Sequence, residues 1–125
     1  MAGLGKIAQI ALTTQDLKKA VTFYRDTLGL RLVSEDPFAA VFDIGGVEMR
    51  LTTVPNHAGA PHTVLGWTVA DIAASARQLA AKGVRFEIYE GFGQDTAGVW
   101  TSPDGKAKVA WFRDPDGNVL SLTQM

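Results

Sequence analysis

The chain has 125 residues, of which 46% are hydrophobic and 20% charged, a mixture typical of one globular domain rather than a disordered segment. Its 12 basic and 13 acidic residues leave a net charge of -1, which argues against a nucleic-acid partner because such partners need a basic surface. The absence of cysteine excludes disulfides and thiolate ligands and fits a cytoplasmic location, and no apolar run reaches the roughly 20 residues of a membrane span.

The first half of the chain predicts a strand, a helix and three further strands. Residues 6–13 alternate in the manner of a strand, and apolar residues at helical spacing after Asp16 predict a helix that Gly29 ends. The strands predicted after this helix are 30–34, 39–44 and 47–53. This order of elements forms a βαβββ module over residues of about 6–53.

The second half repeats the same order, with Asp71 standing 55 residues after Asp16. A strand over 63–69 and a helix that Gly83 ends open a second βαβββ module, which spans about 63–124. The strands predicted to complete it are 84–89, 107–112 and 118–124. Residues 54–62 are rich in proline and predict a linker, whereas residues 90–105 predict a long glycine-rich loop of the kind that forms lids.

The single helix of each module covers only one face of its sheet, so the other face must meet a ligand, a second sheet or a partner chain. Strand alternation places Gln9, Glu48 and Arg50 on the uncovered face of the first module, and Val64 and Ser121 on that of the second. We therefore predict a single α+β domain over 1–125, whose curved mixed sheets enclose a semi-polar trough for a small molecule.

Three segments of the sequence carry a family resemblance: IALTTQDLKKAVTFYRDTLGLRLV, VADIAASARQLAAKGVRFE and WFRDPDGNVLSL. With them the chain resembles the vicinal oxygen chelate superfamily over about residues 6–124. That superfamily includes glyoxalase I, extradiol dioxygenases, fosfomycin-resistance enzymes and bleomycin-resistance proteins. The resemblance implies two βαβββ modules and a homodimer, and its enzymes usually bind one divalent metal ion through four strands. It is specific for the fold and leaves the activity open.

By position, the resemblance implies that the four metal-ligand sites are occupied here by Gln9, Arg50, Val64 and Ser121. Only Gln9 is a ligand of the family type, since Val64 has no lone pair and Arg50 carries a fixed positive charge. A register shifted by two residues would make Glu48 a ligand in place of Arg50. We expect no metal and no cofactor, with one divalent ion as the alternative.

These observations predict a metal-independent small-molecule-binding protein of the glyoxalase/bleomycin-resistance type, which sequesters its ligand. The predicted polar contacts are Gln9, Glu48, Arg50 and Ser121, and the predicted lid residues are Phe92 and Trp100. The alternative function is a divalent-metal lyase, isomerase or dioxygenase, and a third is an interaction module with a filled trough. No catalytic residue is assigned.

Several residues admit two interpretations. Arg50 either binds an anionic group of a ligand or forms a structural ion pair with Glu48 or another acidic residue. Glu48 is either the ion-pair partner of Arg50 or a desolvated general base. The two histidines, His57 and His62, are expected on the linker surface, with His62 near the trough edge. The remaining tryptophans, Trp67 and Trp111, are expected in the core or an interface.

Overall fold

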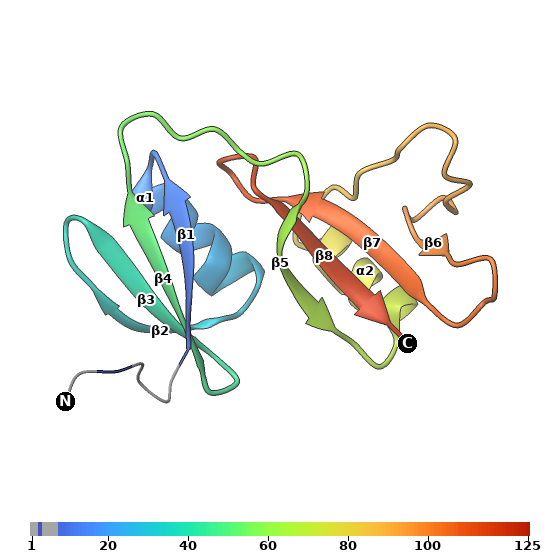
Figure 1. Cartoon of the computed structure of the whole chain (residues 1–125), viewed down its shortest axis with the longest axis horizontal. Coiled ribbons are helices and arrows are strands. Elements are labelled where there is room, and N and C mark those ends of the chain that lie inside the picture. Colours follow the sequence, from blue (N-terminus) through green and yellow to red (C-terminus); the bar gives the residue numbers. More distant parts are fainter. Residues whose placement is uncertain (1–2, 4–7) are drawn as a thin grey trace. The chain divides into compact units, whose positions relative to one another are not determined.

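The computed structural model describes residue 3 and residues 8–125, so the first two residues of the strand predicted over 6–13 lie outside the described part. The chain forms two compact units, Met1–His57 (unit 1) and Ala58–Met125 (unit 2). Each unit contains a four-stranded mixed sheet with a helical segment on one face (Figure 1). This is the α+β fold with two βαβββ modules that the sequence predicts.

The sheet of unit 1 has the strand order β1-β4-β3-β2. Its strands are β1 (Gln9–Thr14), β2 (Arg31–Glu35), β3 (Ala39–Ile44) and β4 (Val47–Thr53). The first strand runs parallel to β4, whereas the two other pairs are antiparallel. The bounds of β3 and β4 agree with the prediction residue for residue.

The helical segment of unit 1 changes type along its length. Helix α1 (Leu17–Thr22) begins where the Asp16 side chain accepts a hydrogen bond of 3.2 Å from the Lys19 amide, as an N-cap does. It continues as a π-helix, η1 (Phe23–Thr27), in which the Leu28 amide donates to the Phe23 carbonyl at 3.0 Å. The predicted helix is therefore present, but its second half is wound more widely than an α-helix.

The sheet of unit 2 has the equivalent order β5-β8-β7-β6. Its strands are β5 (Thr63–Thr68), β6 (Trp100–Thr101), β7 (Lys108–Arg113) and β8 (Val119–Gln124). Helix α2 (Ile72–Ala81) is capped by Asp71, whose carboxylate accepts a hydrogen bond from the Ala74 amide at 3.1 Å. It packs against β7 and β8. Both helix starts thus confirm the repeated aspartate cap.

The strand predicted over 84–89 is wrong, because only Phe86 forms a bridge, with Phe112 of β7. The Glu87 amide still donates to Trp111 of β7, but the Tyr89 amide, which would be the next donor along that ladder, bonds the Gln94 side chain at 2.6 Å. The edge position is taken instead by β6, which lies inside the segment predicted as a loop.

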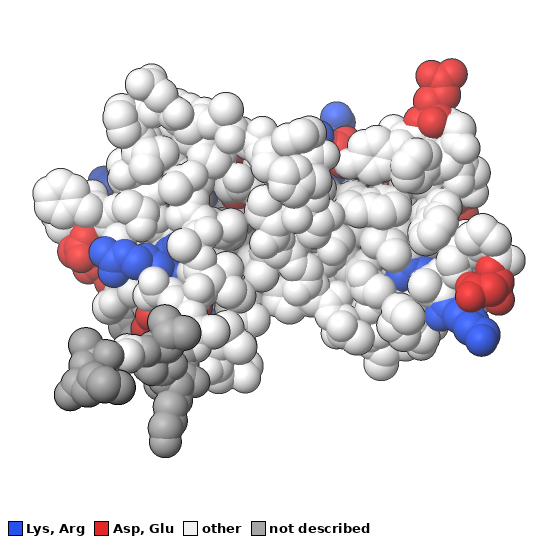
Figure 2. All heavy atoms as spheres, in the orientation of Figure 1, with Lys and Arg blue, Asp and Glu red and all other residues white. Residues whose placement is uncertain are grey.

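The core of each unit lies between its sheet and its helix, as strand alternation predicts. Side chains with no more than 8% of their surface exposed occupy the helix-facing positions of the strands: Leu12, Phe42, Met49 and Leu51 in unit 1, and Leu65, Ala110, Phe112, Leu120 and Leu122 in unit 2. Charged side chains of both signs form small groups on the visible surface of each unit (Figure 2). Neither α-helix of the described chain is long and apolar enough to cross a membrane.

Candidate functional site

Each sheet has one face that its helical segment leaves uncovered, called here the open face. In β4, exposed Glu48 and Arg50 alternate with fully buried Met49 and Leu51. In β1, exposed Gln9 lies on the same face as Glu48, since the two are register partners. The structure therefore places all three predicted polar residues of unit 1 on its open face.

A polar row crosses all four strands of this face. The Gln9 amide donates a hydrogen bond to the Glu48 carboxylate. Asp43 of β3 lies opposite Glu48, and it forms an ion pair of 3.4 Å with Arg31 of β2. Three of these residues, Glu48, Asp43 and Arg31, line a cavity of about 250 Å³. Glu48 is thus bound by an amide, rather than by Arg50 as one interpretation of the sequence held.

Arg50 forms no hydrogen bond or ion pair with any residue that the structure describes. It lies opposite Ala11 of β1 and Val41 of β3, neither of which offers a polar side chain. The pKa of the Asp36 carboxyl lies below its usual range chiefly because the amides of Phe38 and Ala39 donate to it, and the Arg50 charge adds a smaller effect. The guanidinium is therefore available to an anion on the open face.

The open face of unit 2 has a different chemistry. Its polar candidate, Ser121 of β8, is 8% exposed and lies opposite both Gly66 of β5 and Trp111 of β7. Val64 is 36% exposed, and a register shift interrupts the pairing of β5 around it. Apolar and aromatic groups therefore dominate where unit 1 has charges.

Three aromatic rings of unit 2 line a cavity of about 320 Å³, called here the aromatic cavity. The rings belong to Tyr89, Phe92 and Trp111, and their centroids lie 5.5 to 6.1 Å apart. Its other lining residues are Pro61, His62, Thr63 and Val119. Such a mostly apolar hollow with a few polar groups has the character of a ligand site.

The loop after Phe86 brings two of these rings to the open face. Gln94 organises this loop: its side-chain amide donates to the carbonyls of Glu87 at 2.9 Å and Gly98 at 2.7 Å, and its oxygen accepts from the Tyr89 amide. The loop is thus closed on itself by one side chain. Tyr89 and Gln94 were both missed by the sequence analysis, although strand alternation from Phe86 puts Tyr89 on the open side.

The structure separates the predicted aromatic residues into different roles. Phe92 lines the aromatic cavity, whereas Trp100 is not one of its lining residues and only packs beside Trp111, with 6.4 Å between the ring centroids. Trp111, expected in the core or an interface, is half-buried on the open face and lines the cavity. Trp67 is half-buried and alternates onto the side of β5 that faces α2. His62 is exposed, as expected for the linker surface, and it lines the cavity.

The second linker histidine, His57, is bound rather than free on the surface as expected. Its Nδ1 lies 2.6 Å from the Thr13 hydroxyl of β1, and its carbonyl accepts a hydrogen bond from the Gln15 side chain at 2.5 Å. These contacts tie the end of unit 1 to its first strand, and they leave the buried Nε2 of His57 without a hydrogen-bond partner in the described part of the chain.

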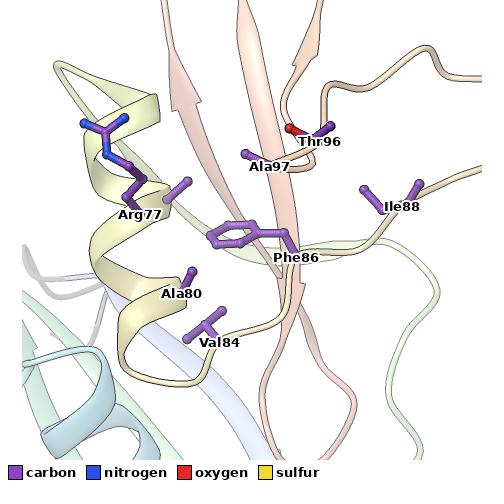
Figure 3. A pocket seen from close by; sticks show the side chains of 8 residues that line it. Arg77, Ala80, Val84, Phe86, Ile88, Thr96 and Ala97 are labelled. Atoms are coloured by element: carbon purple, nitrogen blue, oxygen red, sulfur yellow. The ribbon is translucent and has the colours of Figure 1, made fainter.

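A further cavity, of about 250 Å³, lies on the other side of unit 2, between α2 and the segment that follows it. Figure 3 shows the Phe86 ring pointing toward the helix, with Ala80 and Val84 beside it. The guanidinium of Arg77 points away from that ring (Figure 3). This cavity is therefore lined mostly by apolar side chains, with Arg77 and Thr96 as its polar residues.

The donors on the two open faces do not fit the metal site that the resemblance implies. Gln9 and Glu48 supply two oxygen-bearing side chains in unit 1. On the open face of unit 2, Val64 has no donor atom, and the paired strands β5 and β8 supply only hydroxyls, such as those of Thr63 and Ser121. Catalytic divalent ions usually take three or more nitrogen, oxygen or sulfur ligands. Among the described residues, no group of three or more His, Asp or Glu side chains could hold an ion.

Comparisons with known proteins agree with this fold. The chain is 29% identical to the uncharacterized protein YraH of Bacillus subtilis, over 96% of this chain and 98% of that protein. Its fold matches the fosfomycin resistance protein FosX of Listeria monocytogenes with a TM-score of 0.76 at 13% identity, covering 98% of this chain and 95% of that one. It matches the lactoylglutathione lyase of Agrobacterium tumefaciens with a TM-score of 0.71 at 23% identity, covering 98% and 96%.

The family model agrees with the resemblance noted from the sequence motifs. It matches residues 6–122, which include both βαβββ modules and the loop that bears the cavity rings. By this match, the chain belongs to the Glyoxalase/Bleomycin resistance protein/Dioxygenase superfamily.

Proposed function

We propose that the chain is a metal-independent small-molecule-binding protein, which sequesters its ligand in the aromatic cavity of unit 2. The observation that carries this proposal is the composition of the equivalent rows on the two open faces. Unit 1 has Gln9 and Glu48 there, whereas unit 2 has Thr63 and Val119 at the wall of a cavity lined by three rings. A hollow of this chemistry favours burial of an apolar or π-bonded ligand over coordination of a metal ion.

The proposal extends to the open face of unit 1 as a polar surface that suits an anionic group. Arg50, which has no ion pair within the described chain, supplies a cation there. Whether Gln9, Glu48 and Arg50 share one trough with Ser121, Phe92 and Trp100 stays a prediction. A homodimer in the cytoplasm completes the proposal, supported by the strongly exposed Val33 and Phe38 side chains and by the cysteine-free sequence.

The decisive experiment combines metal analysis with ligand binding. Protein purified without chelator is analysed for divalent metals and then titrated with indole, with and without EDTA, while amide chemical shifts are recorded. We expect substoichiometric metal and EDTA-insensitive binding that shifts the resonances of Tyr89 and Trp111. Stoichiometric metal together with EDTA-sensitive binding would instead support the divalent-metal enzyme.

A further inference from the structure

We infer that the aromatic cavity selects compact organic cations of the tetraalkylammonium kind, which it binds through cation–π contacts. The inference rests on the proposed function, since it names the ligand class of that same cavity. Three features of unit 2 carry it: the mutual inclination of the rings, the absence of charged residues in the lining, and the charge of the loop that supplies two of the rings.

The rings of the aromatic cavity are inclined to one another. The interplanar angles are 51° for Tyr89 and Phe92, 71° for Tyr89 and Trp111, and 81° for Phe92 and Trp111. A flat aromatic ligand clamped between two rings needs those rings to be nearly parallel, because it stacks on both. No two rings of the cavity form such a slot. Inclined rings around one hollow instead suit a rounded group, which several π systems can contact together.

The lining of the aromatic cavity holds no fixed positive charge that would repel a bound cation. Its seven residues include no lysine, arginine, aspartate or glutamate. The cation nearest along the strands is Arg113, two residues after Trp111, and its guanidinium is held by the Glu87 carboxylate and by the Gly117 carbonyl at 2.9 Å. Its charge is therefore balanced by an adjacent carboxylate. An anionic ligand, in contrast, would find no lysine or arginine in this lining, whose one basic side chain is His62.

The loop that carries two of the rings is acidic. Residues 85–99 contain one arginine and three carboxylates, and the excess of negative charge is one after Glu87 is set against its ion-pair partner Arg113. One of the other carboxylates, Glu90, lies exposed between Tyr89 and Phe92 in the sequence. Neighbouring negative charge raises the local concentration of cations and lowers that of anions. The negative charge of this loop and the aromatic lining of the cavity therefore both favour a positively charged ligand.

The test compares two ligands of the same shape that differ in charge. Choline and 3,3-dimethylbutan-1-ol share a hydroxyethyl arm and a tetrahedral head, in which carbon replaces the ammonium nitrogen of choline. Their dissociation constants are measured with the full chain by NMR titration. We expect choline to bind about tenfold more tightly than the alcohol, as contacts with more than one ring imply. Trp111→Leu and Phe92→Leu should each remove most of that preference, whereas Trp67→Phe, on the other side of β5, should retain it.

Each other outcome is informative. If the alcohol binds as tightly as choline, or if both cavity variants keep the preference for choline, the cation inference is overturned and the cavity remains a ligand site. If neither compound binds, the inference is also overturned, and the indole titration then decides the proposed function separately. Phe92 is 50% exposed, so its replacement leaves the core intact even if the Trp111 variant does not fold.

Discussion

Gly66 of β5 provides the sharpest test of how tightly the open face of unit 2 is packed. A methyl group added at this position would lie 2.5 Å from the Ser121 hydroxyl oxygen and 3.2 Å from the Ser121 carbonyl oxygen. The first distance is well inside van der Waals contact, so Ser121 or the β5–β8 pair must move. We therefore expect Gly66→Ala to destabilise the chain, although alanine usually strengthens a strand relative to glycine.

The magnitude follows from two opposing effects. Overpacking costs about 1–3 kcal/mol, and the loss of glycine flexibility returns roughly 0.5–1 kcal/mol, so Gly66→Ala should lower the free energy of unfolding by about 0.5–2 kcal/mol. In a Ser121→Ala background the hydroxyl is gone, and the closest remaining atom would be the backbone carbonyl oxygen of residue 121, 3.2 Å away. There the same substitution should cost clearly less, because only this milder contact remains, which gives a coupling energy of about 1 kcal/mol.

Urea denaturation of the four chains of this double-mutant cycle measures the coupling. Ala11→Gly serves as the matched control, because Ala11 occupies the equivalent position of unit 1, opposite Arg50. It should cost only the roughly 0.5–1 kcal/mol expected for glycine in a strand. If Gly66→Ala has the same effect with and without the Ser121 hydroxyl, the packing argument is refuted.

Three further predictions concern single side chains. Asp114→Ala should lower the free energy of unfolding by roughly 1.5–3 kcal/mol in urea denaturation, since this 5% exposed carboxylate accepts hydrogen bonds from the amide and side chain of Asn118. The control Asp104→Ala, in an exposed turn, should lower it clearly less, and equal losses would contradict the prediction. The pKa of Asp36, measured by carboxyl NMR, should lie below the ordinary 3.8. The contribution of Asp36 to stability is therefore present above pH 3.8 and is lost as the pH falls through the lowered pKa. An unshifted pKa would show that the amides of Phe38 and Ala39 do not stabilise the carboxylate. Arg50→Ala should change the free energy of unfolding by no more than about 0.5 kcal/mol, as expected for an exposed side chain without an ion pair, and a loss above about 1 kcal/mol would restore the structural-pair interpretation.

Local pattern was sufficient for most of the fold. The aspartate caps, the turns and the alternation of β3 and β4 are short-range features. In a segment such as Val47–Thr53, the order of polar and apolar residues is sufficient to predict which side chains are buried. The strand predicted over 84–89 failed for a different reason. Val84, Phe86 and Ile88 alternate as a strand does, but the Gln94 side chain takes the Tyr89 amide that the ladder needed. The alternation of polar and apolar residues in 84–89 cannot show that a side chain five residues later will accept the hydrogen bond of a strand amide.

The candidate site was predictable only in part. Strand alternation placed Gln9, Glu48 and Arg50 correctly on one face, because side-chain direction follows from the strand period. The aromatic cavity needed tertiary information, since it joins the linker, the loop and the end of β7. Phe92 was singled out by its loop, whereas Trp111 was misplaced because a large aromatic residue in a strand fits a core and an exposed wall equally well.

The interrupted edge of the unit 2 sheet has a consequence for how such a domain can diversify. Because the chain leaves β7 after Phe86 and returns only at Trp100, the excursion between them is anchored at both ends by strand pairing. Changes in its exposed part, around Phe92, would reshape the recess over Trp111, whereas its buried end at Val99 belongs to the hydrophobic core. A complete edge strand in place of this loop would be fixed along its whole length by pairing with β7, and its residues could vary less. The exposed part of this segment can thus vary in sequence separately from the strands that carry the core.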